Sequence, residues 1–387
     1  MSSWEPDSDF VFHMPTKVLY GPGSHREIRA EMADLACDRA VIVTDRGLRE
    51  NTDLPARIQK ALGATCVGVF DDVEPDSRFE IVDAGAAFAA KLGADCLVSV
   101  GGGSSMDTTK AISIVMTNGG SIREHLAVHA LTGPQTPHIA VPTTAGTGSE
   151  VTNVALIKDE AARTKFFVLD NQIFPRTAIL DPTLTTGLPA GLTASTAMDA
   201  MTHAIEAITS ICRNSMSESF AVQAIGMING AIRRAVEAPE DILARGTLLS
   251  AATMAGAAFC NAMVGVVHAV AHALGGVCSV PHGIANSIML PHAIHFNAVT
   301  DAEAYAPVVA TLGIKASSPL AAAQMAAARL TELAASCGLQ TKLSQVGVNR
   351  RQFQEIADKA MADGAVLNNC RPVAGPEEIV ALLDAAF

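Results

Sequence analysis

Two side chains that can bind a metal ion lie four positions apart in the segment 198–207, MDAMTHAIEA. The segment contains no glycine or proline and favours a helix, so Asp199 and His203 would share one face, one turn apart. A carboxylate oxygen and an imidazole nitrogen at this spacing can bind one divalent cation. An Asp–His hydrogen bond inside a core helix would give the same pattern, so the pair alone leaves both interpretations open.

Three further histidines follow in two later segments. His268 and His272 are four residues apart in GVVHAVAHALG (265–275), and His282 follows in PHGIANSIMLPH (281–292). Buried imidazoles without partners are unfavourable, whereas three imidazoles and one carboxylate suit Fe²⁺ or Zn²⁺ and leave a position for a substrate. The spacing does not distinguish whether His268 or His272 is the ligand. Separate histidines, each with its own hydrogen bonds, are the alternative.

Two loops of the N-terminal half have the composition of anion-binding turns. The glycine-rich stretch GGGSSMD (101–107) follows the apolar strand expected at 95–100 and precedes a helix. Glycines let the backbone approach a phosphate closely, and a helix N-terminus presents free N–H groups. The stretch PTTAGTGSE (142–150), after a strand at 138–141, offers hydroxyls at a second strand end. Tight turns without a ligand are the alternative for both loops.

The elements that must position these residues change character near residue 187. Before it, apolar strands alternate with helices, which predicts parallel βαβ units, with strands at 40–44, 65–70, 95–100 and 138–141. A separate β-rich lobe is expected from strands at 151–157, 165–169 and 177–180. After it, the apolar periodicity is helical to the end of the chain. The sequence thus predicts an α/β domain over 1–187 and an all-α domain over 188–387.

The composition excludes several classes of protein. The 387 residues are 49% hydrophobic and 17% charged, which excludes a disordered chain, and the net charge of -12 without a basic run argues against nucleic acid or an anionic membrane as partner. Eight scattered cysteines without a C-x-x-C motif, and an N-terminus unlike a signal peptide, predict a cytoplasmic protein. The uncharged stretch 248–280 contains Asn261 and two histidines, so a buried helix is favoured over a membrane span.

Five segments, in order along the chain, resemble the iron-containing, group III metal-dependent alcohol dehydrogenases; they are GGGSSMDTTKA (101–111), PTTAGTGSEVT (142–152), MDAMTHAIEA (198–207), GVVHAVAHALG (265–275) and PHGIANSIMLPH (281–292). The resemblance implies a dehydroquinate synthase-like architecture. In it the α/β domain with a parallel sheet binds the dinucleotide, and the all-α domain binds metal and substrate.

The resemblance also implies roles for particular residues. The family's metal ligands match Asp199, His203, His268 and His282. His272 resembles a histidine that lies beside nicotinamide and substrate without binding metal, and it would either relay a proton or have a structural role near the metal. The cofactor-binding positions match two loops, a strand end and a lysine, namely Asp45, Gly101, Gly102, Gly103, Ser104, Ser105, Thr143, Thr144, Thr147 and Lys165. A carboxylate at position 45 should repel a 2′-phosphate, which favours NAD over NADP. A helix cap is the other interpretation of this aspartate.

The activity implied is a metal-dependent, NAD-linked alcohol dehydrogenase or aldehyde reductase for small aliphatic alcohols, diols or aldehydes. The metal, Fe²⁺ or else Zn²⁺, would polarise the alcohol oxygen while a hydride passes to nicotinamide C4. A hydroxyacid or 4-hydroxybutyrate dehydrogenase stays open if Lys165 or Arg371 binds a carboxylate, and a dehydroquinate synthase-like sugar-phosphate lyase is a further alternative. A homodimer or higher homo-oligomer is expected. Glu150 and Glu206 have no assigned role and are expected to be solvated or to cap helices.

Overall fold

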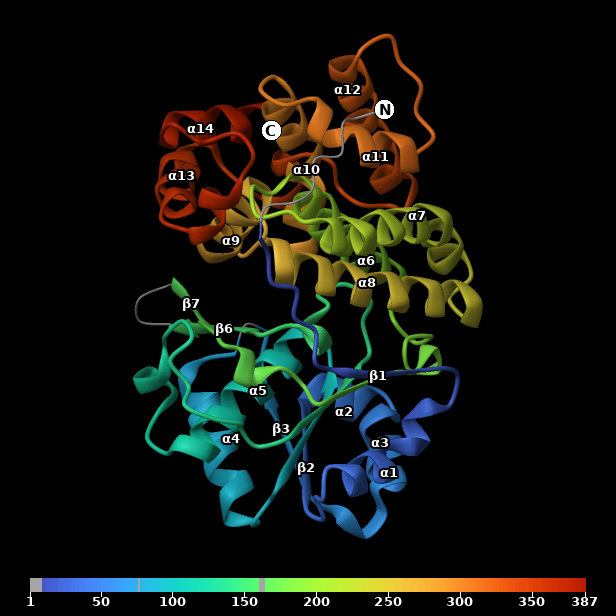
Figure 1. Cartoon of the computed structure of the whole chain (residues 1–387), viewed down its shortest axis with the longest axis vertical. Coiled ribbons are helices and arrows are strands. Elements are labelled where there is room, and N and C mark those ends of the chain that lie inside the picture. The colour runs from blue at the N-terminus through green and yellow to red at the C-terminus, as the bar shows by residue number, and fades with distance from the viewer. Residues whose placement is uncertain (1–8, 76, 160–163) are drawn as a thin grey trace. The chain divides into compact units, whose positions relative to one another are not determined.

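The structure is a computed structural model that describes residues 9–75, 77–159 and 164–387 (Figure 1). The chain divides into two compact units. The first, which we call the sheet unit, consists of Pro15–Thr193 with Arg234–Thr253. The second, the helical unit, consists of the described part of Met1–Met14, Ala194–Arg233 and Met254–Phe387.

The sheet unit is built on six parallel strands in the order β1-β8-β5-β4-β2-β3. They are β1 (Lys17–Tyr20), β2 (Ala40–Asp45), β3 (Cys66–Val73), β4 (Cys96–Gly101), β5 (His138–Pro142) and β8 (Thr177–Leu180). The three strands β5, β4 and β2 in the middle of the sheet are almost wholly buried, which explains their continuous apolar sequences. The predicted parallel sheet is confirmed.

Helices cover both faces of this sheet, and successive side chains of one strand enter separate cores. Val43 of β2 lies in one cluster with Val82 of α4 and Ile112 of α5. The neighbouring Ile42 lies in the other cluster with Ile28 of α1. Figure 1 accordingly shows α4 and α5 on one side of the sheet and α1 to α3 on the other. The helices are α1 (Ile28–Asp34), α2 (Arg46–Asn51), α3 (Leu54–Leu62), α4 (Phe79–Lys91) and α5 (Gly103–Asn118).

The prediction of a separate three-stranded lobe is wrong for one of its strands. β6 (Val154–Asp159) and β7 (Thr164–Leu169) form a two-stranded antiparallel sheet. The segment Thr177–Leu180 instead joins the main sheet as β8, between β5 and β1. Its four residues are all buried, whereas β6 alternates between buried and half-buried side chains. A strand buried on both faces belongs in the middle of a covered sheet, and this difference in pattern separates the two strands.

From residue 190 to the end of the chain the regular elements are helices, and this confirms the predicted helical half. The end of α7 and the first half of α8, within Arg234–Thr253, belong to the sheet unit. The helices are α6 (Ala190–Thr209), α7 (Ser215–Glu237), α8 (Ile242–Ala262), α9 (Val266–Cys278), α10 (His282–Ala298), α11 (Ala306–Thr311), α12 (Pro319–Ser336), α13 (Phe353–Met361) and α14 (Pro376–Ala385). Helix α10 packs against α9, α12 and α14, and α9 packs against α13. Among the described residues, α8 alone is long and apolar enough to cross a membrane, and 67% of its most apolar window is buried.

A buried histidine joins two central strands of the sheet unit. Nε2 of His138 on β5 lies 2.7 Å from the hydroxyl of Ser99 on β4. The imidazole is fully enclosed, and burial together with the nearby ammonium group of Lys110 lowers the pKa of His138 to about 3. The side chain is therefore neutral in the folded protein at neutral pH.

This shift predicts an acid-sensitive contribution to stability. Because the pKa of His138 is about 3 in the folded chain and near 6.5 when unfolded, the unfolded chain binds the extra proton between these values. The stability that the neutral His138 contributes is complete at pH values above the pKa of the unfolded chain and decreases as the pH falls below it. Acidification from about pH 7.5 to about pH 5 should cost the wild type roughly 2 kcal/mol more unfolding free energy than His138→Gln. Urea titrations at both pH values measure this difference, and an equal loss in both proteins would contradict it.

Candidate metal centre and cofactor loops

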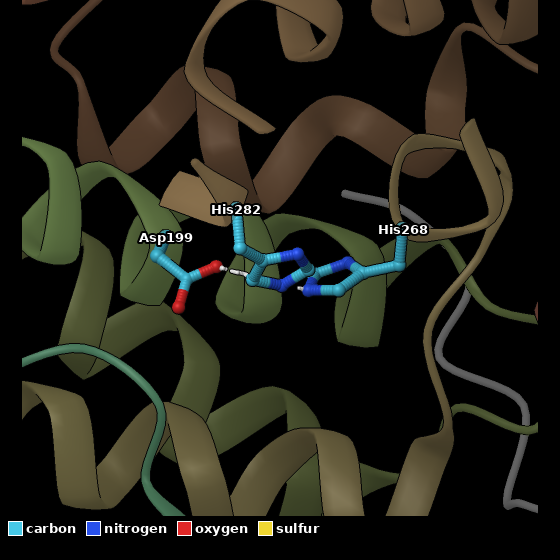
Figure 2. Close-up of side chains that lie close together, drawn as sticks. All are labelled: Asp199, His268 and His282. Carbon is cyan, nitrogen blue, oxygen red and sulfur yellow. Dashed lines mark ion pairs between the residues drawn. The ribbon is translucent and has the colours of Figure 1, made fainter. Parts of the chain in front are cut away.

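Three of the predicted ligands point toward one another from three helices (Figure 2). Asp199 lies on α6, His268 on α9, and His282 is the first residue of α10. Oδ1 of Asp199 is 3.5 Å from Nε2 of His282 and 4.0 Å from Nε2 of His268, and the three ligand atoms lie within 4.8 Å of one another. Two atoms that each lie about 2.0–2.2 Å from one ion can be at most about 4.4 Å apart. The two separations from Asp199 therefore suit a shared divalent cation.

The fourth predicted ligand lies beside this group. The His203 ring stacks on the His268 ring with 4.4 Å between centroids, and on the Phe259 ring at 4.3 Å. Among the described residues, the atoms that converge within 4.8 Å belong to Asp199, His268 and His282. The structure thus brings three ligand atoms together and places the fourth imidazole in contact with one of them, so that ligation by His203 stays a prediction.

Asn286 stands at the centre of the group and was missed by the sequence analysis. Its Nδ2 lies 2.6 Å from Oδ1 of Asp199 and 3.2 Å from Nε2 of both His268 and His282. An amide nitrogen only donates and carries two N–H groups, so Oδ1 of Asp199 can accept one of them and the two imidazole Nε2 atoms can share the other through their lone pairs. Its own oxygen is buried without a hydrogen-bond partner among the described residues. Lone pairs that converge in a buried space are what a cation site requires. The four-residue spacing from His282 was the available signal.

His268 and His272 are distinguished by their partners. Nε2 of His268 belongs to the converging group, whereas Nδ1 of His272 is 2.8 Å from Oδ2 of Asp363. The His272 ring stacks on the His282 ring with centroids 5.3 Å apart. Burial acts to raise the pKa of Asp363, but the hydrogen bond and charge of His272, together with the backbone N–H of Ala365, hold this pKa below its ordinary value. His272 is therefore adjacent to the candidate metal centre and oriented by a carboxylate.

The two unassigned glutamates are buried, so of the two expected roles a solvated side chain is wrong for both, whereas a helix cap fits Glu206. Glu206 accepts hydrogen bonds from the backbone N–H of Val267 at 2.7 Å and from Nδ1 of His268 at 2.6 Å, and so caps the start of α9. Burial raises the pKa of Glu206 to about 7, against the opposing effect of the backbone N–H groups of Gly265, Val267 and His268. Glu150 accepts a hydrogen bond from Thr253 at 2.6 Å, and burial raises its pKa as well.

Three of the predicted cofactor segments of the sheet unit, at the ends of β2, β4 and β5, lie at one edge of the sheet. β2, β4 and β5 are neighbours and parallel, so their carboxyl ends lie together where the strand order reverses, the usual nucleotide position in such sheets. Asp45 ends β2, the glycine loop follows β4, and the threonine loop follows β5. The backbone N–H of Thr143 donates to the carbonyl of Gly101 at 2.9 Å, which joins the two loops.

Side chains on two glycines would crowd the threonine loop where these loops touch. A Cβ atom on Gly102 would lie 3.2 Å from Oγ1 of Thr144, and one on Gly103 would lie 2.7 Å from Cγ2 of Thr147. Helix α5 begins at Gly103, and its N-cap Gly102 has no side chain to occupy the first N–H groups. The loop can therefore offer backbone donors to phosphate oxygens. Ser104 follows within the first turn of α5.

The remaining cofactor candidates have different surroundings. Ser105 is buried, and a Cβ on Gly101 would lie 2.3 Å from its hydroxyl. Oδ1 of Asp45 accepts from the backbone N–H of Leu48 at 2.7 Å and caps α2, while Oδ2 would be 3.9 Å from that same Cβ position. The cap is thus present, and the second oxygen faces the glycine loop. Lys165 pairs with Lys158 in the β6–β7 ladder, but its side chain lies outside the described part of the chain.

Lys110 lies on α5, the helix that begins in the glycine loop, and its burial was not predicted from the sequence. Its ammonium group donates to Oγ of Ser149 at 2.7 Å and to the carbonyl of Val154 at 2.8 Å. It lies 3.6 Å from a carboxylate oxygen of Asp107. A fully buried ammonium group needs such partners, and here they connect α5 to the chain that leaves the threonine loop.

Comparisons with known proteins agree over both halves of the chain. The family model described as "Iron-containing alcohol dehydrogenase" matches residues 15–182, and "Fe-containing alcohol dehydrogenase family, C-terminal" matches residues 193–387. The chain is 37% identical over 380 residues to the NAD-dependent methanol dehydrogenase of Bacillus methanolicus, covering 97% of this chain and 99% of that one. It is 36% identical over 385 residues to the 1,3-propanediol dehydrogenase of Klebsiella pneumoniae, covering 98% and 99%. A crystal structure of 1,3-propanediol oxidoreductase superimposes with a TM-score of 0.95 at 35% identity, covering 98% and 100%.

The two oxygens of Asp45 predict how a variant changes dinucleotide preference. Asp45→Asn keeps an acceptor for the N–H of Leu48 but removes the negative charge that would oppose a 2′-phosphate. We expect the ratio of NADPH to NADH affinity to rise about tenfold, measured by nucleotide fluorescence. Asp45→Ala, which also removes the cap, serves as comparison and should lose about 1 kcal/mol of stability besides. An unchanged ratio in both variants would show that Asp45 serves only as a cap.

Proposed function

This chain belongs to the iron-containing alcohol dehydrogenase family, and we propose that it catalyses the reversible, NAD-linked oxidation of small aliphatic alcohols or diols to aldehydes. The observation that carries the proposal is the convergence of Asp199, His268 and His282, two of them buried and one half-buried, on one point. The names of the relatives support an alcohol as substrate and NAD as hydride acceptor.

The chemistry divides between two sets of residues. When bound, a divalent cation supplies a Lewis acid that lowers the pKa of an alcohol hydroxyl, and NAD⁺ supplies the carbon that accepts a hydride. Asp199, His268 and His282, with His203 as a further candidate, would hold the cation. His272 would exchange the alcohol proton at Nε2, because Nδ1 is already engaged by Asp363.

The sheet unit would hold the dinucleotide. Backbone N–H groups at Gly101–Gly103 would bind the pyrophosphate, and the hydroxyls of Thr143, Thr144 and Thr147 would provide further polar contacts. Asp45 would accept hydrogen bonds from the adenosine ribose. We accordingly assign NAD binding to residues 1–187, and metal and substrate binding to residues 188–387.

The surroundings of Arg371 favour a neutral substrate over a hydroxyacid. Its guanidinium group donates to Oε1 of Glu378 at 2.7 Å and to the carbonyl of Phe296 at 2.7 Å, and it lies 3.6 Å from the centroid of the Phe296 ring. A guanidinium group with these partners has its charge compensated within the protein. Binding a substrate carboxylate would require it to give up these contacts.

Three further features belong to the proposal. Fe²⁺ is the favoured metal, although the same nitrogen and oxygen donors also accept Zn²⁺. All eight cysteines are free thiols, which supports a cytoplasmic location. The functional assembly is a homodimer or a higher homo-oligomer.

The proposed activity can be tested by reconstituting the metal-depleted protein separately with Fe²⁺ and Zn²⁺ and supplying NAD⁺. Primary alcohols, diols and the corresponding aldehydes with NADH would be screened by the absorbance change of the nicotinamide. Short neutral alcohols should be oxidised, and hydroxyacids should react more slowly. Absence of turnover with every alcohol and aldehyde, despite bound metal and bound NAD, would refute the proposal.

His268→Ala should remove metal and turnover together. Two of the three converging ligand atoms would remain, so we expect less than about a tenth of the wild-type metal content and a loss of at least about a thousandfold in kcat/KM. Metal analysis of the purified protein and the NADH assay measure the two quantities. His292→Ala, which removes a partly buried histidine on α10 away from the group, is the matched control and should retain both. Full metal content in His268→Ala would contradict the assignment.

A further inference from the structure

Glu206 reaches His268 through the ring nitrogen that does not face the metal site. It follows Asp199 by seven residues, so the two carboxylates lie on the same side of α6, two turns apart. Oε2 of Glu206 lies 2.6 Å from Nδ1 of His268, and both side chains are buried. One helix therefore carries a carboxylate that faces the candidate cation and another that contacts a histidine ligand on a different helix.

The two nitrogens of His268 face partners of opposite hydrogen-bonding character. The carboxylate at Nδ1 accepts, whereas the amide nitrogen of Asn286, 3.2 Å from Nε2, donates. A neutral imidazole carries one proton, and this environment places that proton on Nδ1 and the lone pair on Nε2. Only this tautomer directs a lone pair toward Asp199 and His282.

We propose that Glu206 is a positioning residue that fixes the His268 imidazole in its metal-binding tautomer and so sets the affinity of the metal site. The proposal rests on the metal site of the proposed function. Carboxylates that accept the second N–H of a ligating histidine orient the ring and increase its basicity. Loss of such a partner typically weakens metal binding by about 10–100-fold.

Glu206 also has a structural role at the start of α9, and the experiment must separate this role from its effect on the His268 tautomer. Oε1 accepts the backbone N–H of Val267 at 2.7 Å, at the start of α9. Glu206→Gln keeps the size of the side chain but cannot satisfy both contacts. If its amide nitrogen faces His268, it donates to Nδ1 and selects the tautomer whose Nε2 carries the proton. If its oxygen faces His268, the amide nitrogen opposes the N–H of Val267.

Asn369 provides a matched control at the same helix end. Its Oδ1 accepts from the backbone N–H of Val266 at 3.3 Å, and it has no described hydrogen bond to His268. Asn369→Ala therefore removes this contact at the start of α9, together with the hydrogen bonds of Asn369 to Asn297 and to the carbonyl of Arg371, and leaves the His268 imidazole with Glu206. A structural effect at this end of α9 should appear in both variants, whereas an effect on the tautomer should appear only in Glu206→Gln.

The dissociation constant of Zn²⁺ is measured for the full-length wild type and both variants by competition with a chromophoric chelator near neutral pH. Circular dichroism and thermal midpoints confirm that each protein is folded and report lost stability. Glu206→Gln should raise the dissociation constant about 10–100-fold, and Asn369→Ala by less than about threefold while its thermal midpoint falls. Affinity in Glu206→Gln within about threefold of wild type would overturn the proposal, as would equal weakening in both variants. A wild type that binds Zn²⁺ but oxidises no alcohol with either metal would instead refute the proposed function.

Discussion

The main constraint on the helical unit is that several lone pairs must converge inside an apolar interior. The atoms of Asp199, His268 and His282 lie within 4.8 Å of one another, although buried polar groups are unfavourable without compensation. Compensation comes from neighbours with opposite character. Asn286 donates into the group, Glu206 accepts from the back of His268, and Asp363 engages the adjacent His272. The arrangement of α6, α9 and α10 must satisfy all of these contacts together with the packing of their apolar residues.

A different constraint governs the sheet unit, where two loops must approach each other without side chains between them. Strands β2, β4 and β5 are adjacent and parallel, so their ends meet at one edge regardless of the loop sequences. The close approach of Gly103 to Thr147, where a Cβ would lie 2.7 Å from Cγ2, then favours glycine on one side. Buried Lys110 connects the same two regions beneath the loops. The loop geometry therefore depends on contacts deeper in the sheet as well as on the glycines themselves.

Much of this arrangement could be predicted from the sequence because it follows from local periodicity. Continuous apolar runs indicated the central strands, and the helical spacing of Asp199 and His203 and of His268 and His272 indicated shared faces. The placement of β8 could not be predicted in this way, because its neighbours in the sheet, β1 and β5, are distant in the chain. Spacing also could not choose between His268 and His272. That distinction arises from Glu206 and Asp363, which belong to other helical segments of the chain.

Two of the helices that carry predicted metal ligands also carry a second polar side chain with a role at the site. On α6, Glu206 lies two turns after Asp199 and contacts a histidine of α9. On α10, Asn286 lies one turn after His282 and contacts Asp199 of α6. Each helix thus provides a metal-facing atom together with a side chain that contacts a ligand on another helix. Such reciprocal contacts make the position of each ligand depend on the packing of its neighbours, because a shift of one helix would displace two ligands. The site is therefore a property of the assembled helices, and Asp199 with His203 on α6 forms only one part of it.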